Sequence, residues 1–208
     1  MADPFAKGLV LRTYLAASHL VGPLGRWHLA RRLARGKEDP ARWREKLGVA
    51  SVARPKGPVV WLHAVGVGEA LALPGLARVL MAERPGLAVL ITTSTRTSAD
   101  ALAAPLPPGC QHQFLPLDAA PFVARFLDHW QPDLAVWAER DIWPALVVAT
   151  ARRGVAQLLV NGRMSAGSYR AKVRAGGLYR DLYRIMASVG VQDTGSATHF
   201  AALPPHRR

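Results

Sequence analysis

The sequence has a single cysteine, Cys110, among its 208 residues. One thiol cannot form an internal disulfide, and its presence suits a reducing compartment. One cysteine is also too few for a zinc site built from cysteines. The 7 histidines never show the H-x-x-x-H spacing of a helical metal site. The sequence therefore predicts no disulfide framework and no metal centre.

Long hydrophobic runs are also missing. No stretch reaches the roughly 18 consecutive apolar residues of a membrane-spanning helix, because polar residues and Pro23 interrupt residues 8–25. This segment lacks a clear small-residue cleavage site, so we expect no secretory signal. Two interpretations stay open, an interfacial helix among lipid head groups and a helix packed on its own domain. In the first, apolar side chains enter the head-group region and arginines meet lipid phosphates: Leu9, Leu11, Leu15, Leu20 and Val21, with Arg12, Arg26, Arg31, Arg32 and Arg35.

Acidic residues are scarce, since 14 Asp and Glu face 27 Lys and Arg for a net charge of +13. The excess lies at the two ends: residues 1–57 carry +8, residues 58–161 carry −1 and residues 162–208 carry +6. Basic flanks attract polyanions such as nucleic acid, anionic lipid or a phosphorylated substrate. The aromatic residues are few and do not alternate with the basic ones, which argues against single-stranded nucleic acid.

Several catalytic signatures are absent as well. The sequence contains no G-x-S-x-G and no P-loop, so hydrolase and kinase functions lack support. Gly66 and Gly68 match the start of a dinucleotide-binding fingerprint, but the third glycine and the acidic residue of that fingerprint are missing.

What is present is an alternation of apolar runs and helical segments. We expect strands at 59–65, 87–92, 113–117, 134–137, 155–160 and 188–192, and helices at 69–84, 97–103, 121–130, 143–153 and 179–186. Strands joined by single helices indicate a parallel sheet covered on both faces. Right-handed crossovers make this an α/β fold with a doubly wound, Rossmann-like sheet. The sequence also predicts N-terminal helices at 5–21, 26–35 and 40–47, and a last helix with a basic tail within 194–208.

Two acidic residues follow predicted strands, where open α/β sheets bind their ligands. Glu69 comes after a strand and a turn that begins at Gly66. A partly desolvated carboxylate there could take a proton from an attacking hydroxyl. Glu139 and Asp141 follow another strand, so Glu69 and Glu139 could face one cleft. A phosphate could instead sit at the helix start that carries Glu69. The structural alternatives are that Glu69 only complements the helix dipole and that Asp141 caps a helix.

Two other strand ends carry candidate binding residues. Thr95 and Arg96 lie in a Ser/Thr-rich segment whose hydroxyls and backbone N–H groups could hold an anion or sugar oxygens. Alternatively, these hydroxyls cap the next helix. Asn161 and Arg163 follow a later strand. Arg163 suits bidentate phosphate contact, or it is a solvated loop residue.

Five segments, in family order, resemble the bacterial 3-deoxy-D-manno-octulosonic acid (Kdo) transferases over roughly residues 9–203. They are GKEDPARWREKLG (36–48), VWLHAVGVGEALALPGL (60–76), ITTSTRTSA (91–99), FLPLDAAPFVARFLDHWQPDLAVWAERDIWP (114–144) and VNGRMSAGSYR (160–170). The resemblance implies a GT-B-type, inverting, metal-independent glycosyltransferase. It would transfer Kdo from CMP-Kdo to the lipid A precursor, lipid IVA, in lipopolysaccharide biosynthesis.

The resemblance also implies roles for the candidate residues. Glu69 matches the family's catalytic base, which would deprotonate the acceptor's 6′-hydroxyl so that it attacks the anomeric carbon of Kdo as CMP departs. Glu139 matches a glutamate important for activity. The remaining candidates would bind substrate, the arginines through the acceptor's two phosphates: Asp141, Thr95, Arg96, Asn161 and Arg163.

The family's N-terminal domain takes the acceptor at the cytoplasmic face of the inner membrane. We therefore expect residues 1–57 to form basic, apolar helices and residues 58–208 to form the Rossmann-like acceptor domain. The family's donor-binding C-terminal domain has no counterpart here, so we expect transfer to need such a domain in trans, with no cofactor. Gly66 stands where the family usually has Ser, and Ala145 where Asn is common. The alternative is a non-catalytic module that binds anionic glycolipid or a membrane surface.

Overall fold

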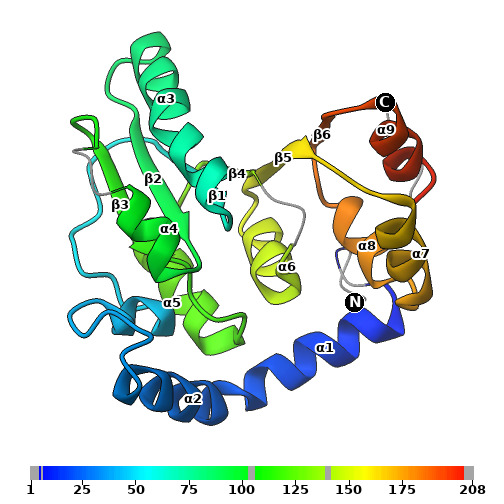
Figure 1. Ribbon diagram of the computed structural model, residues 1–208, viewed down its shortest axis with the longest axis horizontal. Helices are drawn as coiled ribbons and strands as arrows, with labels where there is room; N and C mark the ends of the chain where they lie inside the picture. Colours follow the sequence, from blue (N-terminus) through cyan, green and yellow to red (C-terminus); the bar gives the residue numbers. More distant parts are fainter. Residues whose placement is uncertain (1–4, 6, 103–105, 139–141, 204–208) are drawn as a thin grey trace.

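The computed structural model describes residues 5, 7–102, 106–138 and 142–203 (Figure 1). Within these residues, six parallel strands form one sheet in the order β3-β2-β1-β4-β5-β6. The strands are β1 (Val59–Ala64), β2 (Ala88–Thr93), β3 (Cys110–Phe114), β4 (Leu134–Trp137), β5 (Ala156–Gly162) and β6 (Ser188–Val191). The chain builds outward from β1 to β3 and then crosses to β4 on the other side of β1. This is a doubly wound, Rossmann-like order, so the predicted fold class is confirmed.

Helices connect the strands and precede the sheet. The connecting and C-terminal helices are α3 (Val67–Glu83), α4 (Arg96–Ala101), α5 (Ala120–Trp130), α6 (Pro144–Arg152), α7 (Ala166–Arg174), α8 (Leu178–Tyr183) and α9 (Thr194–Ala201). The N-terminal segments are α1 (Leu9–Leu20), α2 (Gly22–Ala34) and the 3₁₀ helix η1 (Trp43–Leu47).

The central strands are buried on both faces, because helices cover each side. Trp61 of β1 belongs to the core on the side of α5 and α6. The centroid of its ring lies 5.0 Å from that of Phe126 in α5 and 4.9 Å from that of Trp137 in β4. Leu62, the next residue, points to the opposite face and packs with Leu73 of α3. Alternate side chains of a strand point to opposite faces of the sheet, so a continuous apolar run such as that of β1 fits a sheet with two cores. Each aromatic pair adds about 1 kcal/mol beyond its buried area.

The two N-terminal helices, Leu9–Ala34, form an arm that packs along α5 and α6 (Figure 1). Leu11 is 0% exposed and Leu15 is 9% exposed, because both join the core on that side of the sheet. Leu9 and Leu20, in contrast, are 76% and 78% exposed. The expectation that Leu11 and Leu15 enter lipid head groups is therefore wrong, since α6 and α5 already cover that side of α1.

The second arm helix begins at Gly22, four residues before the predicted start. Pro23 lies in its first turn, where a missing N–H costs nothing and a fixed φ favours the helix. In the part of the chain that the structure describes, no helix combines the length and apolar character needed to cross a bilayer.

Several elements in the sheet region differ from the sequence-based expectation. Helix α8 ends at Tyr183, three residues before the predicted end, and β5 runs two residues beyond the predicted strand, to Gly162. Strand β3 covers Cys110–Phe114 rather than 113–117, because it pairs with β2 up to Thr93 and Pro116 cannot continue the ladder. Helix α7 was not predicted, because its sequence is polar and only Lys172 within it is buried.

A buried carboxylate holds the segment between the arm and the sheet. Glu45 of η1 is 1% exposed, and both of its oxygens accept hydrogen bonds from Arg42, at 2.9 and 3.0 Å. The same carboxylate accepts the backbone N–H of Phe114 at 2.8 Å. A buried charge requires such partners, which explains why this charged segment packs against the end of β3.

Candidate functional site

The candidate site lies where the direction of the sheet order reverses, at the carboxyl ends of β1 and β4. These strands are neighbours, with His63 opposite Trp137, and the N–H of Ala138 donates to the carbonyl of His63 at 2.8 Å. After β1 the chain enters α3 on one face, and after β4 it enters α6 on the other. The helices that follow β1 and β4 thus lie on opposite faces of the sheet, and doubly wound sheets bind their ligands at such a reversal of strand order.

Glu69 lies in the first turn of α3 at this edge and is half-buried. The helix has no side-chain N-cap, since Gly66 occupies that position. The carboxylate of Glu69 folds back over Gly66, so that a Cβ added to Gly66 would overlap Oε2 of Glu69. The helix N-terminus favours negative charge there. The structure therefore places a carboxylate at the switch point, the place between β1 and β4 where the strand order reverses. The carboxylate lies directly over the backbone of the turn that begins α3.

His63 lies in β1, two residues before Val65 and the turn that leads into α3. Its Nδ1 lies 3.1 Å from the carbonyl oxygen of Thr92 and 2.9 Å from the hydroxyl of the same residue. Trp61 donates to the hydroxyl of the same threonine at 2.8 Å. Burial lowers the pKa of His63 to about 3, and Nε2 has no hydrogen-bond partner among the described residues. His63 is thus a neutral, buried residue that supports the edge of the sheet.

Thr95 and Arg96 follow β2, the other neighbour of β1. Thr95 is the N-cap of α4, and its hydroxyl accepts the N–H of Ser98 at 3.1 Å. The structure therefore supports the interpretation that Thr95 caps a helix. Its side chain is also exposed to solvent. Arg96 is half exposed and lies 3.7 Å from Asp100, one helical turn further on. Such an exposed pair is weak, so Arg96 can leave it to contact an anion.

Asn161 and Arg163 lie at the carboxyl end of β5, further along the same edge. Asn161 has a positive φ of 59°, at an irregularity in the pairing of β5 with β6. Its side chain accepts a 2.6 Å hydrogen bond from Gln192. Arg163 is exposed, and it helps to lower the pKa of Asp193, after the larger effect of hydrogen bonds from Ser196. Both candidates thus face solvent at the edge that carries Glu69.

Glu139 and Asp141 lie outside the described residues. Ala138 and Ile142, which flank them, are both buried. The structure therefore places the two ends of this connection at the carboxyl edge of β4 and says nothing of the two acidic side chains.

Of the five arginines expected to contact lipid, Arg12 is exposed on α1, and the other four lie on or directly after α2. Arg32 forms an ion pair with Glu38, a carboxylate that is 1% exposed and that also binds Lys46 at 2.6 Å. Arg32 therefore stabilises the fold. Arg31 lies over the ring of Trp27, 4.7 Å from its centroid. The other two, Arg26 and Arg35, are exposed.

Asp118 is a residue of this edge that sequence reasoning missed. It follows β3 and accepts the N–H groups of Ala145 and Leu146, at the start of α6, at 3.0 and 2.8 Å. Its other partner is the hydroxyl of Tyr14 on α1. Burial raises the pKa of Asp118. The criterion that selected Glu69, an acidic residue soon after a predicted strand, also applies to Asp118, which directly follows the predicted strand 113–117.

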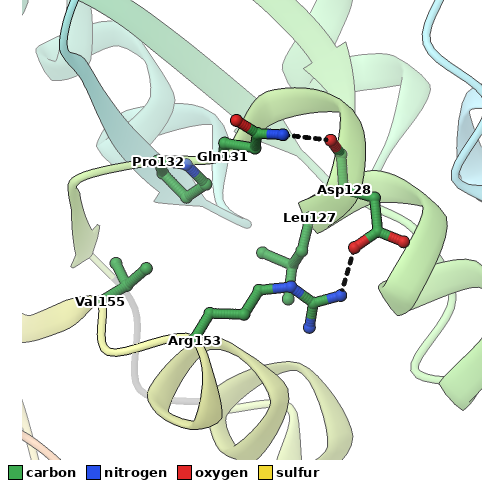
Figure 2. A pocket seen from close by; sticks show the side chains of 6 residues that line it. All are labelled: Leu127, Asp128, Gln131, Pro132, Arg153 and Val155. Atoms are coloured by element: carbon green, nitrogen blue, oxygen red, sulfur yellow. Dashed lines mark hydrogen bonds and ion pairs between the residues drawn. The ribbon is translucent and has the colours of Figure 1, made fainter.

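A shallow pocket of about 410 Å³ lies at the opposite edge, where β4 and β5 begin (Figure 2). Arg153 and Asp128 form a 2.6 Å ion pair in its wall, and Gln131 donates to the carbonyl of Asp128 at 3.1 Å. None of the candidate residues lines this pocket. Within the described residues, no group of three His, Cys, Asp or Glu side chains could hold a metal ion.

These features define a Rossmann-like α/β domain with an acidic residue at its switch point and a helical arm beside it. The family model described as 3-deoxy-D-manno-octulosonic-acid transferase (kdotransferase) matches residues 41–208. The chain belongs to this family.

Curated relatives agree with this assignment. The chain is 37% identical to a probable mitochondrial 3-deoxy-D-manno-octulosonic acid transferase of Arabidopsis thaliana, over 77% of this chain and 36% of that protein. It is 30% identical to the 3-deoxy-D-manno-octulosonic acid transferase of Rickettsia bellii, over 93% of this chain and 46% of that protein. The enzyme of the same name from Haemophilus influenzae is 30% identical over 75% of the chain. The chain thus spans less than half the length of these relatives.

Proposed function

We propose that this chain is the acceptor-binding part of a glycosyltransferase that transfers Kdo from CMP-Kdo to the lipid A precursor, lipid IVA. The observation that carries the proposal is the place of Glu69, at the carboxyl end of β1 and beside β4. CMP-Kdo would bind to a second, GT-B-type domain, supplied by a longer chain or in trans. No cofactor takes part, since the activated sugar carries its own leaving group.

In this reaction Glu69 is the general base. Its carboxylate takes the proton of the acceptor's 6′-hydroxyl, and the oxygen forms a bond to the anomeric carbon of Kdo. The bond from that carbon to the CMP phosphate breaks, and CMP leaves with the electron pair. Attack opposite to the leaving group inverts the anomeric centre. Transfer requires both reactants to be held together in a reactive geometry, which is why a donor domain is needed.

The other candidates would bind the acceptor. Arg96 and Arg163 supply charge for its two phosphates, because both are exposed at the edge that carries Glu69. Thr95 and Asn161 would offer polar contacts to the sugar. Glu139 and Asp141 would complete the site from the β4 connection.

Exposed apolar residues support a lipid-linked acceptor. Val67 and Leu71 flank Glu69 on α3 and are both exposed. On the arm, Leu20, Leu24 and Trp27 are also exposed, and α2 carries the exposed Arg26 and Arg31. Apolar side chains beside Arg are typical of helices that lie in a membrane interface. We place the protein at the cytoplasmic face of the bacterial inner membrane, where the acceptor and CMP-Kdo would meet.

A chimera tests this function. This chain would replace the matching 194-residue segment of the Rickettsia bellii relative, and Kdo transfer from CMP-Kdo to lipid IVA would be measured. We expect transfer by the chimera and a loss of about 100-fold or more for Glu69→Gln. Glu83→Gln, an exposed glutamate at the far end of α3, is the matched control. A Glu69→Gln chimera that transfers at the parent rate would overturn the proposal.

The apolar and basic arm favours one alternative function, a non-catalytic module that binds anionic glycolipid or a membrane surface. Sedimentation with liposomes separates the two. The alternative is supported if the chain binds anionic vesicles, loses binding in Trp27→Ser and Arg31→Ser, and yields an inactive chimera. A chimera that transfers Kdo and depends on Glu69 rules the alternative out.

A further inference from the structure

A buried serine connects two loops at the candidate site. Ser98 lies in α4, after β2, and is 1% exposed. Its hydroxyl donates a 2.6 Å hydrogen bond to the carbonyl oxygen of Val65, the first residue after β1. These residues lie 33 positions apart in the sequence. The bond therefore fastens the turn that leads into α3 to the neighbouring β2–α4 connection.

A second hydrogen bond links the hydroxyl of Ser98 to that of Thr95. The hydroxyl of Thr95 lies 2.9 Å from that of Ser98 and also accepts the N–H of Ser98 at 3.1 Å. A carbonyl oxygen can only accept, so the proton of Ser98 points to Val65. Thr95 then donates to Ser98. Hydrogen bonds arranged in series strengthen one another, and this series ends on the backbone of the β1–α3 turn.

The turn held in this way is the surface on which the Glu69 carboxylate rests. Gly66 follows Val65 directly, and its carbonyl accepts the N–H of Ala70 at 3.0 Å, which begins α3. The Glu69 carboxylate occupies the space above Gly66 that a Cβ would fill. A rotation of the peptide between Val65 and Gly66 would move this surface, and the carboxylate would move with it.

We propose that Ser98 is a positioning residue for Glu69, acting through the carbonyl of Val65. The inference rests on the proposed function for the role of Glu69 as the base. Ser98 is too buried to touch a substrate, so its effect on the reaction passes through the turn. A general base must be held within about 0.5 Å of its productive place, and small displacements cost up to about 100-fold in rate.

The test compares Ser98→Ala with Ser18→Ala. Ser18 is the matched control, because it is 4% exposed and its hydroxyl also donates to a backbone carbonyl, that of Leu15, at 2.6 Å. It lies on α1, outside the site. Hydrogen exchange of the Ala70 amide would be followed by NMR in the full chain. We expect Ser98→Ala to speed this exchange by about 10-fold, and Ser18→Ala to leave it unchanged within about 2-fold.

The chimera gives the catalytic readout. We expect Ser98→Ala to lower kcat by about 10-fold with KM for lipid IVA unchanged within about 2-fold, and Ser18→Ala to change neither. In the Glu69→Gln background, Ser98→Ala should cause no further loss, because its effect needs the carboxylate. Ser98→Cys, nearly isosteric with a weaker donor, should recover part of the rate. It also replaces Ser98→Ala if the alanine variant does not fold.

The results that overturn the inference are distinct from those that overturn the function. Equal behaviour of the Ser98 and Ser18 variants, or an additive loss in the Glu69→Gln background, would refute the positioning role. Full transfer by the Glu69→Gln chimera would instead refute the proposed function, and Ala70 exchange would still show whether Ser98 holds the turn.

Discussion

The hydroxyl of Tyr14, on the N-terminal arm, donates a 2.7 Å hydrogen bond to the carboxylate of Asp118, at the carboxyl edge of the sheet. The same carboxylate accepts two N–H groups at the start of α6. One side chain thus joins the arm, the β3–α5 connection and α6. Its negative charge also complements the dipole of α6. The arm is therefore fastened beside the edge that carries Glu69.

Removal of the Tyr14 hydroxyl should loosen the arm and change the response to alkali. We expect Tyr14→Phe to lower the free energy of unfolding by about 1 kcal/mol, the net contribution of such a bond. Burial, and then the charge of Asp118, raise the pKa of Tyr14 above its ordinary value. The unfolded chain releases this proton at lower pH than the folded one, so stability falls as the pH rises above about 10. Urea unfolding at several pH values should show a smaller fall for Tyr14→Phe, and an equal fall would contradict this account.

Acid should destabilise the fold through two histidines, the buried His63 and the half-buried His112. Burial lowers the pKa of His63 to about 3, and burial followed by the charge of Arg42 lowers that of His112 to about 3. The unfolded chain gains these protons near pH 6.5, whereas the folded chain does not, so stability is lost as the pH falls from about 6.5 toward 3. Each group contributes at most about 1.4 kcal/mol per pH unit.

NMR checks this prediction directly. The C2 protons of His63 and His112 should keep their chemical shifts between about pH 7.5 and 4.5, while urea midpoints fall over the same range. A titration of either ring within that range, in the folded protein, would contradict the burial described for it.

The two sides of α1 should respond differently to truncation. Leu11 is fully buried, so Leu11→Ala should cost about 2–5 kcal/mol of unfolding free energy. Leu20 is 78% exposed, so Leu20→Ala should lower the free energy of unfolding by less than about 0.5 kcal/mol. Thermal unfolding of both variants measures the difference. Equal effects would mean that the arm does not pack on α5 and α6 in solution.

Gly66→Ser should stabilise the fold slightly and displace the carboxylate of Glu69. The backbone of Gly66 is extended, with φ −71° and ψ 155°, so Ser fits and can cap α3, which has no side-chain cap. Ser in place of Gly at an N-cap contributes a few tenths of a kcal/mol. The new Cβ would overlap Oε2 of Glu69, and this flexible side chain would give way. A crystal structure of the variant with Glu69 unmoved would contradict the prediction.

Much of the sheet could be predicted, because its strands are short apolar runs separated by Gly and Pro. The predicted strand 134–137 coincides with β4, and the predicted start of β1 at Val59 is also correct. β3 was misplaced by three residues because Leu115 and Leu117 extend the apolar run beyond the point where pairing stops. α7 escaped notice because a polar helix has no periodic signal.

For the site, local sequence placed Glu69 at a strand-to-helix turn, since that needs only the apolar run and the glycines after it. It could not reveal that Ser98 holds the turn, because the partners are 33 residues apart and meet only when β1 and β2 pair. Nor could it choose between substrate contact and capping for Thr95, since the same hydroxyl serves either purpose.

The residues alone were enough to predict the alternation of strands and helices, the neutral sheet between basic flanks, and the acidic residue after the first strand. These depend on neighbours along the chain. Only the tertiary structure decided which side of α1 is buried, because an apolar stripe on a helix is satisfied equally by lipid or by protein. Here Leu11 and Leu15 meet the core, and Leu20 remains on the surface.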